Sequence, residues 1–154
     1  MWRPHLVLIV SLGLLAGADS AKPKDARHTA EEFLAAALAG KVEDASALAE
    51  KDHVSERQVR KLKDRLAAKA IPLASARASE KGNTALVITG EVRLTKPNPD
   101  GQDRGRLLLT LTRKGGRWLV HDIDFRSETK TKDAERRFLK KFPDAKSVGE
   151  KAGK

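Results

Sequence analysis

The chain has 154 residues, a formal net charge of +10 and no cysteine. This length fits one domain with tails, and the absence of cysteine excludes disulfides, thiol catalysis and thiolate metal sites. The basic excess favours solubility and a weak attraction to anionic surfaces, but it specifies neither a fold nor a site for a specific nucleic acid.

Residues 1–18 are typical of a signal peptide. A short basic start is followed by an apolar run over residues 6–16 and by an A-x-A cleavage sequence at residues 16–18. We therefore expect this segment to be removed and the mature protein to be exported to the periplasm or the extracellular space. Cleavage after Ser20 and retention as an uncleaved membrane anchor are the alternatives. The polar segment 19–28 is predicted to be a disordered leader.

The next part of the chain predicts three helices. Thr29 and Glu32 have the spacing of a capping box, in which a hydroxyl and a carboxylate satisfy free amides at a helix start. Ser55 and Gln58 repeat this spacing, and Gly40 is typical of a helix end. Apolar residues recur at helical intervals after each start. The predicted helices span 29–39, 42–50 and 55–69.

Antiparallel strands are predicted where long and branched apolar residues are concentrated. A weak candidate of small residues at 73–79 precedes strands at 84–95, 106–113 and 117–125. Gly90 interrupts the apolar alternation of the second strand and indicates a bulge or a bend. The residues expected on one side of that strand are Leu86, Ile88, Val92 and Leu94.

The Gly115-Gly116 pair predicts a hairpin, because such turns need positive φ and glycine adopts it without steric penalty. A three-residue loop, 114–116, would place the leucines of the first strand (Leu107, Leu109, Leu111) with Leu119, Ile123 and Phe125. A two-residue loop would place those leucines with Asp122 and Asp124 instead. We favour the three-residue loop because it buries no carboxylate. It leaves Trp118, Asp122 and Asp124 together on the opposite face.

After Phe125 the chain becomes strongly polar. Residues 127–142 are predicted to form a C-terminal extension with a short helix at 133–141, and residues 143–154 a disordered basic tail. The domain proper, 29–126, is predicted to be an α+β fold with three N-terminal helices packed on a curved antiparallel meander of about four strands. Its expected core residues are Phe33, Leu38, Leu62, Leu66, Ile88, Leu109, Leu119 and Ile123.

Two stretches resemble the nuclear transport factor 2-like superfamily (SnoaL-like, cystatin-like cone). AEEFLAAALAGKVEDASAL at 30–48 is similar to its opening helices, and GGRWLVHDIDF at 115–125 is similar to its last strand. The resemblance covers about 29–126 and implies a curled sheet wrapped over helices, with a cone-shaped pocket. It leaves the activity open, because this fold hosts dehydratases, isomerases, cyclases and non-catalytic modules.

Six side chains are candidates for lining a pocket: Trp118, Asp122, Asp124, Glu91, Arg93 and His121. The two aspartates are interpreted either as a general base with a neighbour that raises its pKa or as a polar strand end paired with arginine. Trp118 is interpreted as a packing residue, with ligand stacking as the alternative, and His121 as a satisfied core or rim histidine. Glu91 and Arg93 are expected in a cross-strand charge network. His53 lies in a predicted helix connector and is expected to have a surface or capping role.

We assign no catalytic residue, metal ligand or cofactor, because no phosphate loop, nucleophile elbow or metal-ligand spacing is found. Enzymes of the superfamily often place an Asp-His pair or several tyrosines in the pocket, and this chain has no tyrosine. The sequence therefore favours an exported, non-catalytic binding or scaffold domain for a protein or small ligand, with a homodimer through the sheet as a further option. The alternatives are a pocket enzyme with Asp122 or Asp124 as base and a basic module that docks on an anionic polymer or membrane surface.

Overall fold

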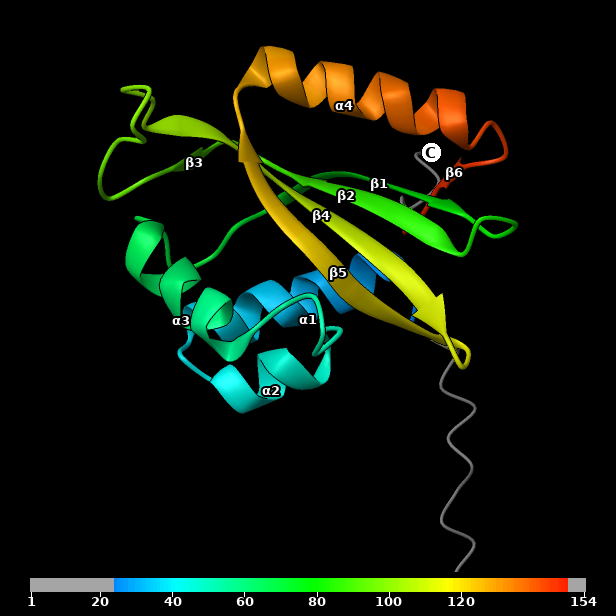
Figure 1. The fold of residues 1–154 in the computed structure, drawn as a ribbon, viewed down its shortest axis with the longest axis horizontal. Helices are drawn as coiled ribbons and strands as arrows, with labels where there is room; N and C mark the ends of the chain where they lie inside the picture. Colours follow the sequence, from blue (N-terminus) through cyan, green and yellow to red (C-terminus); the bar gives the residue numbers. More distant parts are fainter. Residues whose placement is uncertain (1–23, 150–154) are drawn as a thin grey trace, which may run out of the picture.

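Three helices come first in the chain: α1 (Ala26–Leu38), α2 (Val42–Ala47) and α3 (Glu56–Arg65). In this computed structural model, which describes residues 24–149, they are followed by β1 (Leu73–Ser79), β2 (Thr84–Thr89), β3 (Val92–Arg93), β4 (Arg104–Lys114), β5 (Arg117–Arg126), α4 (Glu128–Lys141) and β6 (Lys146–Ser147). Helices α1–α3 lie on one side of the sheet and α4 crosses the other side (Figure 1). The predicted α+β class, with helices before the sheet, is confirmed. No helix within the described range is long and apolar enough to span a membrane.

The sheet is an antiparallel meander in which β2 pairs with β1, β4 with β2, and β5 with β4. The prediction of about four strands is too low, because the part of the chain that the structure describes forms six. One addition is β3, which pairs with the first residues of β4 and is the far part of the predicted strand 84–95. The other is β6, which pairs with β1.

The first helix begins earlier than the sequence predicts. Asp25 is its N-cap, and its side chain accepts a hydrogen bond from the backbone N–H of His28 at 2.8 Å. Thr29 is therefore a buried residue inside the helix and not a capping residue. The earlier start is favoured because Asp is as good a cap as Thr and because it adds the buried Ala26 to the apolar face. Residues 25–28 thus belong to the domain, whereas the predicted signal peptide and the rest of the leader up to residue 23 lie outside the described residues.

Helix α3 begins as predicted, with a capping box between Ser55 and Gln58. It ends at Arg65 and not at 69, because Leu66 is extended and forms an isolated bridge with Leu94. Helix α2 also ends earlier than predicted. The residues after it leave the helix to run beside β5, where Ala49 forms a parallel bridge with Val120.

The β4–β5 hairpin has a two-residue turn, so the favoured three-residue loop is wrong. Gly115 and Gly116 both have positive φ, and Lys114 pairs with Arg117. The three leucines Leu107, Leu109 and Leu111 nevertheless do not share a face of the sheet with Asp122 and Asp124, because β5 contains a β-bulge. Leu111 pairs with Val120 and Thr110 with Asp122, so that His121 is the extra residue. Beyond the bulge, Leu109 pairs with Ile123. The two residues therefore share a face, as the three-residue loop had been predicted to arrange.

Gly90 separates β2 from β3 and reverses which side the apolar residues face. Leu86 and Ile88 pack with Leu108 under α4, whereas Val92 and Leu94 belong to the main core on the helical side. The expectation that these four residues share one side is therefore wrong. The backbone N–H of Gly90 donates to the carbonyl oxygen of Pro72 at 2.7 Å, which fixes the bend.

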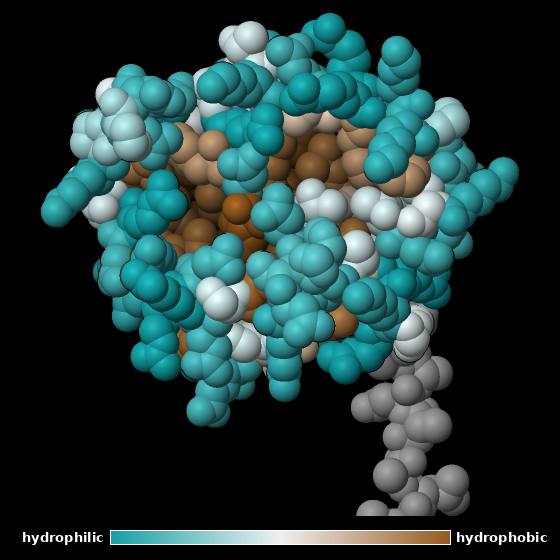
Figure 2. Space-filling view, viewed as in Figure 1, coloured by the Kyte–Doolittle hydropathy of each residue, from teal (hydrophilic) through white to brown (hydrophobic). Residues whose placement is uncertain are grey.

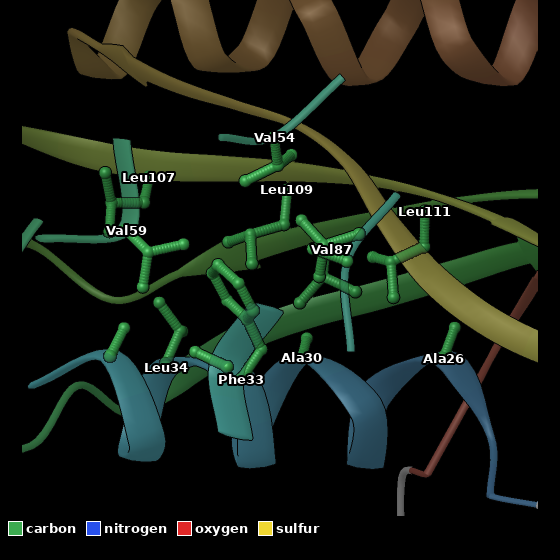
Figure 3. Close-up of a cluster of buried hydrophobic side chains, with 14 of the residues drawn as sticks. Ala26, Ala30, Phe33, Leu34, Val54, Val59, Val87, Leu107, Leu109 and Leu111 are labelled. Atoms are coloured by element: carbon green, nitrogen blue, oxygen red, sulfur yellow. The ribbon is translucent and has the colours of Figure 1, made fainter. Parts of the chain in front are cut away.

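The main core lies between α1–α3 and the side of the sheet that faces these helices (Figure 3). Phe33 and Leu109 are fully buried there, and Leu38 and Leu66 are also buried, as predicted. Leu62 and Ile123 are half-buried at its margin, and Ile88 is buried in the second cluster under α4. Leu119 belongs to neither cluster. The two-residue turn places it opposite Thr112, whereas Trp118 and Val120 take the inward positions.

The segment after Phe125 is more ordered than predicted. Helix α4 begins at Glu128 with Ser127 as its N-cap, five residues before the predicted start at Asp133. Residues 143–149 are not a disordered tail, because β6 pairs with β1 and Val148 packs against the main core. Residues 150–154 lie outside the described range.

Candidate functional site

An apolar cavity of about 110 Å³ lies between α3 and the sheet. The helical spacing of α3 turns one stripe of its residues toward this space, and the strands supply the opposite wall. Figure 2 shows the corresponding apolar surface in the hollow between α3 and the sheet. The lining residues are Gln58, Lys61, Leu62, Arg65, Leu66, Leu94, Leu107, Ile123 and Phe125.

The rim and the floor of this cavity differ in character. Lys61 and Arg65 are exposed and lie one turn apart on α3, so that both cations stand beside the opening. Leu62, Ile123 and Phe125 are only half-buried, which leaves apolar surface in contact with solvent. The arrangement is suited to an apolar group that carries a negative charge at its outer end.

A second cluster of functional groups surrounds the buried carboxylate of Glu50, which follows α2. Oε2 of Glu50 lies 3.1 Å from Nδ1 of His121, 3.6 Å from Nε2 of His53 and 3.2 Å from Nζ of Lys114. The hydroxyl of Thr112 donates a hydrogen bond to the other carboxylate oxygen, Oε1. Backbone hydrogen bonds hold the junction in place, since the N–H of Glu50 donates to the carbonyl of Val120 at 2.9 Å.

The charge of Glu50 is compensated although the side chain is only 6% exposed. Burial alone would raise the pKa of this carboxyl, but hydrogen bonds from His121 and Lys114 outweigh the burial and lower its pKa below the usual value of 4.5. Glu50 is therefore ionised at neutral pH. Glu50, His53 and His121 each direct one potential metal-ligand atom to a common space, with all three atoms within 4.8 Å of one another.

The structure does not bring the six sequence-predicted pocket residues into one site. His121 lies in the Glu50 cluster, and Trp118 is buried in the main core. Asp122 and Asp124 lie on the α4 side of the sheet, so the predicted grouping of Trp118 with the aspartates is wrong. The bulge at His121 is the reason, because it places Trp118 and Asp122 on opposite faces.

The two aspartates line a hollow of about 180 Å³ under α4. Asp124 accepts a hydrogen bond from Nε of Arg126 at 2.5 Å, and Asp122 is exposed. This matches the interpretation of a polar strand end paired with arginine.

Glu91 and Arg93 lie apart from the other four candidates, next to and within β3. Arg93 pairs with Asp103 at 3.4 Å, and Glu91 is exposed. The Arg93–Asp103 ion pair thus connects β3 to the residue before β4, and Glu91, which was expected in the same network, takes no part in this pair.

Sequence reasoning missed Glu50, Thr112 and Lys114, and for His53 it predicted only a surface or capping role; the surface position is confirmed. One signal was present: Glu50 and His53 have an E-x-x-H spacing, and His121 is the third histidine of the mature chain. Their convergence with His121 depends on the pairing of residues 48–50 with β5, which no local pattern indicates.

Comparison with known proteins assigns no family, since no family model matches the chain and no curated protein is significantly similar to it.

Proposed function

We propose that the chain is an exported binding domain, related to the nuclear transport factor 2-like superfamily, whose cavity between α3 and the sheet takes a small anionic ligand with a short apolar group. One observation carries the proposal: the cavity has an apolar floor, and two cations, Lys61 and Arg65, stand at its opening. Export is supported by the signal-peptide pattern of residues 1–18.

The size of the cavity limits the ligand. Sites for drug-sized molecules have about 300–1,000 Å³, and this cavity has about 110 Å³. A short alkyl chain fits this space and would cover the exposed parts of Leu62, Ile123 and Phe125. Each buried methylene contributes about 0.8 kcal/mol, so a chain of a few carbons supports a weak affinity that the cations increase.

Binding is favoured over catalysis by the position of the carboxylates. None of the residues that line this cavity within the described chain is acidic, so it offers no carboxylate base. Asp122 and Asp124 lie on the opposite side of the sheet, and Asp124 is engaged by Arg126. The enzyme alternative would need a second, separate ligand site under α4.

The test compares hexanoate with hexan-1-ol, which has the same chain length and no charge. We expect hexanoate to bind the full chain more tightly in isothermal titration calorimetry and to shift amide resonances of α3 and β5 in NMR spectra. The charge-reversal variant K61E/R65E should lower the affinity for hexanoate by about tenfold or more, the loss that 1.4 kcal/mol produces. It should leave hexan-1-ol unaffected.

The matched control is R57E/R60E, which changes the same net charge on the same helix away from the cavity. Its affinity for hexanoate should stay within about threefold of the wild type at moderate salt, because both side chains are exposed to screening. If the two variants lost the same affinity for hexanoate, the protein would have only a general attraction to anions. That result would support the alternative of a basic docking module.

A further inference from the structure

We propose that Glu50, His53 and His121 form a binding site for a divalent transition metal ion of the zinc type. The site is independent of the proposed ligand cavity, because none of these three residues lines that cavity. It joins the connector after α2 to the bulge in β5.

The separations of the ligand atoms fit a single ion. With bonds of about 2.0–2.1 Å, the ligands of a tetrahedral zinc site are about 3.3–3.4 Å apart. Oε2 of Glu50 lies 3.1 Å from Nδ1 of His121 and 3.6 Å from Nε2 of His53. All three ligand atoms lie within 4.8 Å of one another. The rings of His53 and His121 pack against each other with centroids 3.9 Å apart and an interplanar angle of 39°. Because an imidazole binds a metal ion in the plane of its ring, the exposed ring of His53 must turn to admit the ion between the three atoms.

The neighbouring residues orient the ligands. The hydroxyl of Thr112 donates a hydrogen bond to Oε1 of Glu50, which leaves Oε2 directed at the imidazoles. The backbone N–H groups of His53 and Val54 both donate to the carbonyl of Glu50, at 3.0 and 2.8 Å, and so hold the connector in a tight turn. His121 is held by the bulge, so all three ligands lie on constrained backbone.

The ligand types select the class of metal. Two imidazoles and one carboxylate suit Zn²⁺ and its neighbours, whereas Ca²⁺ and Mg²⁺ prefer oxygen ligands alone. The side chain of His53 is 49% exposed, so an ion has a route from solvent. Three protein ligands leave a coordination position open to water or to an exogenous ligand.

Lys114 opposes metal binding and supplies a second test. Its ammonium lies 3.2 Å from the same oxygen, Oε2, that the ion requires, but its side chain is 63% exposed and can turn into solvent. Its replacement by a neutral residue removes a competing cation. Metal affinity should therefore increase in Lys114→Gln.

The experiment titrates the full chain with Zn²⁺ by calorimetry near neutral pH, in a buffer that does not bind metal. One ion should bind per chain, and Co²⁺ should give the visible absorption of a four- or five-coordinate ion. The variant H53A/H121A should lose at least about 100-fold in affinity, since even the loss of residues that support metal ligands costs about 10–100-fold. The control H28A removes the remaining histidine of the expected mature chain and should stay within about threefold of the wild type.

The control is closely matched, because His28 also lies beside a glutamate, with Nε2 3.2 Å from Glu32, but lacks a second histidine. Circular dichroism would establish that H53A/H121A and H28A are both folded. The proposal is overturned if the wild type shows no 1:1 binding of Zn²⁺, if H53A/H121A and H28A lose affinity equally, or if Lys114→Gln fails to bind Zn²⁺ more tightly than the wild type.

Discussion

The carboxylate of Glu50 and the imidazole of His121 lie 3.1 Å apart, although 71 residues separate them in the chain. Glu50 follows the second helix and His121 lies in the last long strand, so their contact joins the helical layer to the edge of the sheet. Val120 reinforces this junction, because its N–H donates to the carbonyl of Leu48 and its carbonyl accepts from Glu50, both at 2.9 Å. The outer edge of β5 is thereby covered.

The hydrogen bond from Thr112 to Glu50 should contribute to the stability of this junction. Thr112→Val removes the hydroxyl and keeps the shape, and we expect a loss of about 1–2 kcal/mol in the free energy of unfolding, because the acceptor is charged. Thr110→Val, two residues earlier on the same face of the strand, where the side chain lines the hollow under α4, is the control and should change stability by less than about 0.5 kcal/mol. Urea denaturation measures both. Similar values for the two variants would contradict the assigned role.

Identical substitutions at Leu109 and Leu119 should differ strongly in their effect. Leu109 is fully buried, so Leu109→Ala should cost about 2–5 kcal/mol of stability through lost burial and a cavity. Leu119 lies outside both apolar clusters, so Leu119→Ala should cost less than about 1 kcal/mol. Chemical denaturation of the two variants tests whether the side chain of Leu109 points into the main core and that of Leu119 points away from it. A loss below about 1 kcal/mol at Leu109 would mean that its side chain points the other way.

Asp144 should make the C-terminal segment sensitive to acid. The hydroxyl of Ser79, which is fully buried, lies 2.8 and 2.9 Å from the two oxygens of Asp144 and lowers the pKa of this carboxyl below its ordinary value of 3.8. Because the pKa of Asp144 is lower in the folded than in the unfolded state, the ionised carboxylate stabilises the protein at pH values above its ordinary pKa. This stabilisation is lost as the pH falls through the lowered pKa of the folded state. Asp144→Ala should therefore be less stable than the wild type near neutral pH, and the difference should shrink at about pH 3.

Asp100→Ala, in an exposed loop, is the control for the Asp144 experiment. It should follow the wild type at both pH values in urea denaturation. A difference between wild type and Asp144→Ala that persists unchanged in acid would show that the carboxylate is not responsible.

Deletion of His121 should lower stability, because Glu50 loses a hydrogen-bond partner, but should keep the fold, whereas deletion of Ile123 should disrupt the packing of the hairpin. Without His121 the ladder becomes regular and still pairs Leu111 with Val120 and Leu109 with Ile123. Without Ile123 an aspartate takes its place opposite Leu109, and partial burial of that carboxylate at the margin of the core should strongly destabilise the fold. Amide spectra by NMR distinguish the two outcomes. An unfolded His121 deletion beside a folded Ile123 deletion would refute the bulge.

The sequence predicted the fold better than its details, and the errors have physical causes. The weak candidate of small residues at 73–79 has the observed bounds of β1. Apolar alternation located the other strands, because the alternation reflects burial directly. The alternation failed to predict which side of the sheet the side chains point to after Gly90 and His121, because one irregular residue there reverses the orientation of the side chains that follow. A three-residue loop was predicted between β4 and β5 because it keeps Asp122 and Asp124 out of the core. In the structure a two-residue turn and the bulge at His121 together keep these aspartates out of the core.

The candidate sites were predicted less well, because they depend on contacts between distant segments. The sequence predicts His121 as a pocket residue, but it indicates for its partner Glu50 only the end of the predicted helix 42–50. Nothing in the sequence separates Lys61 and Arg65 from the other basic residues of the predicted helix 55–69. Only the packing of α3 over the sheet distinguishes them from Arg57 and Arg60 on the same helix.

The position of the β4–β5 hairpin has a consequence for the order of events during synthesis. The residues against which Phe33 and Ala30 are buried, such as Leu109 and Val120, leave the ribosome long after the helices do. Short helices are unstable alone, so α1–α3 cannot complete their packing before β5 has been made. A nascent chain should therefore stay open until about residue 126, and this delay would keep it suitable for threading through a translocation channel before it folds.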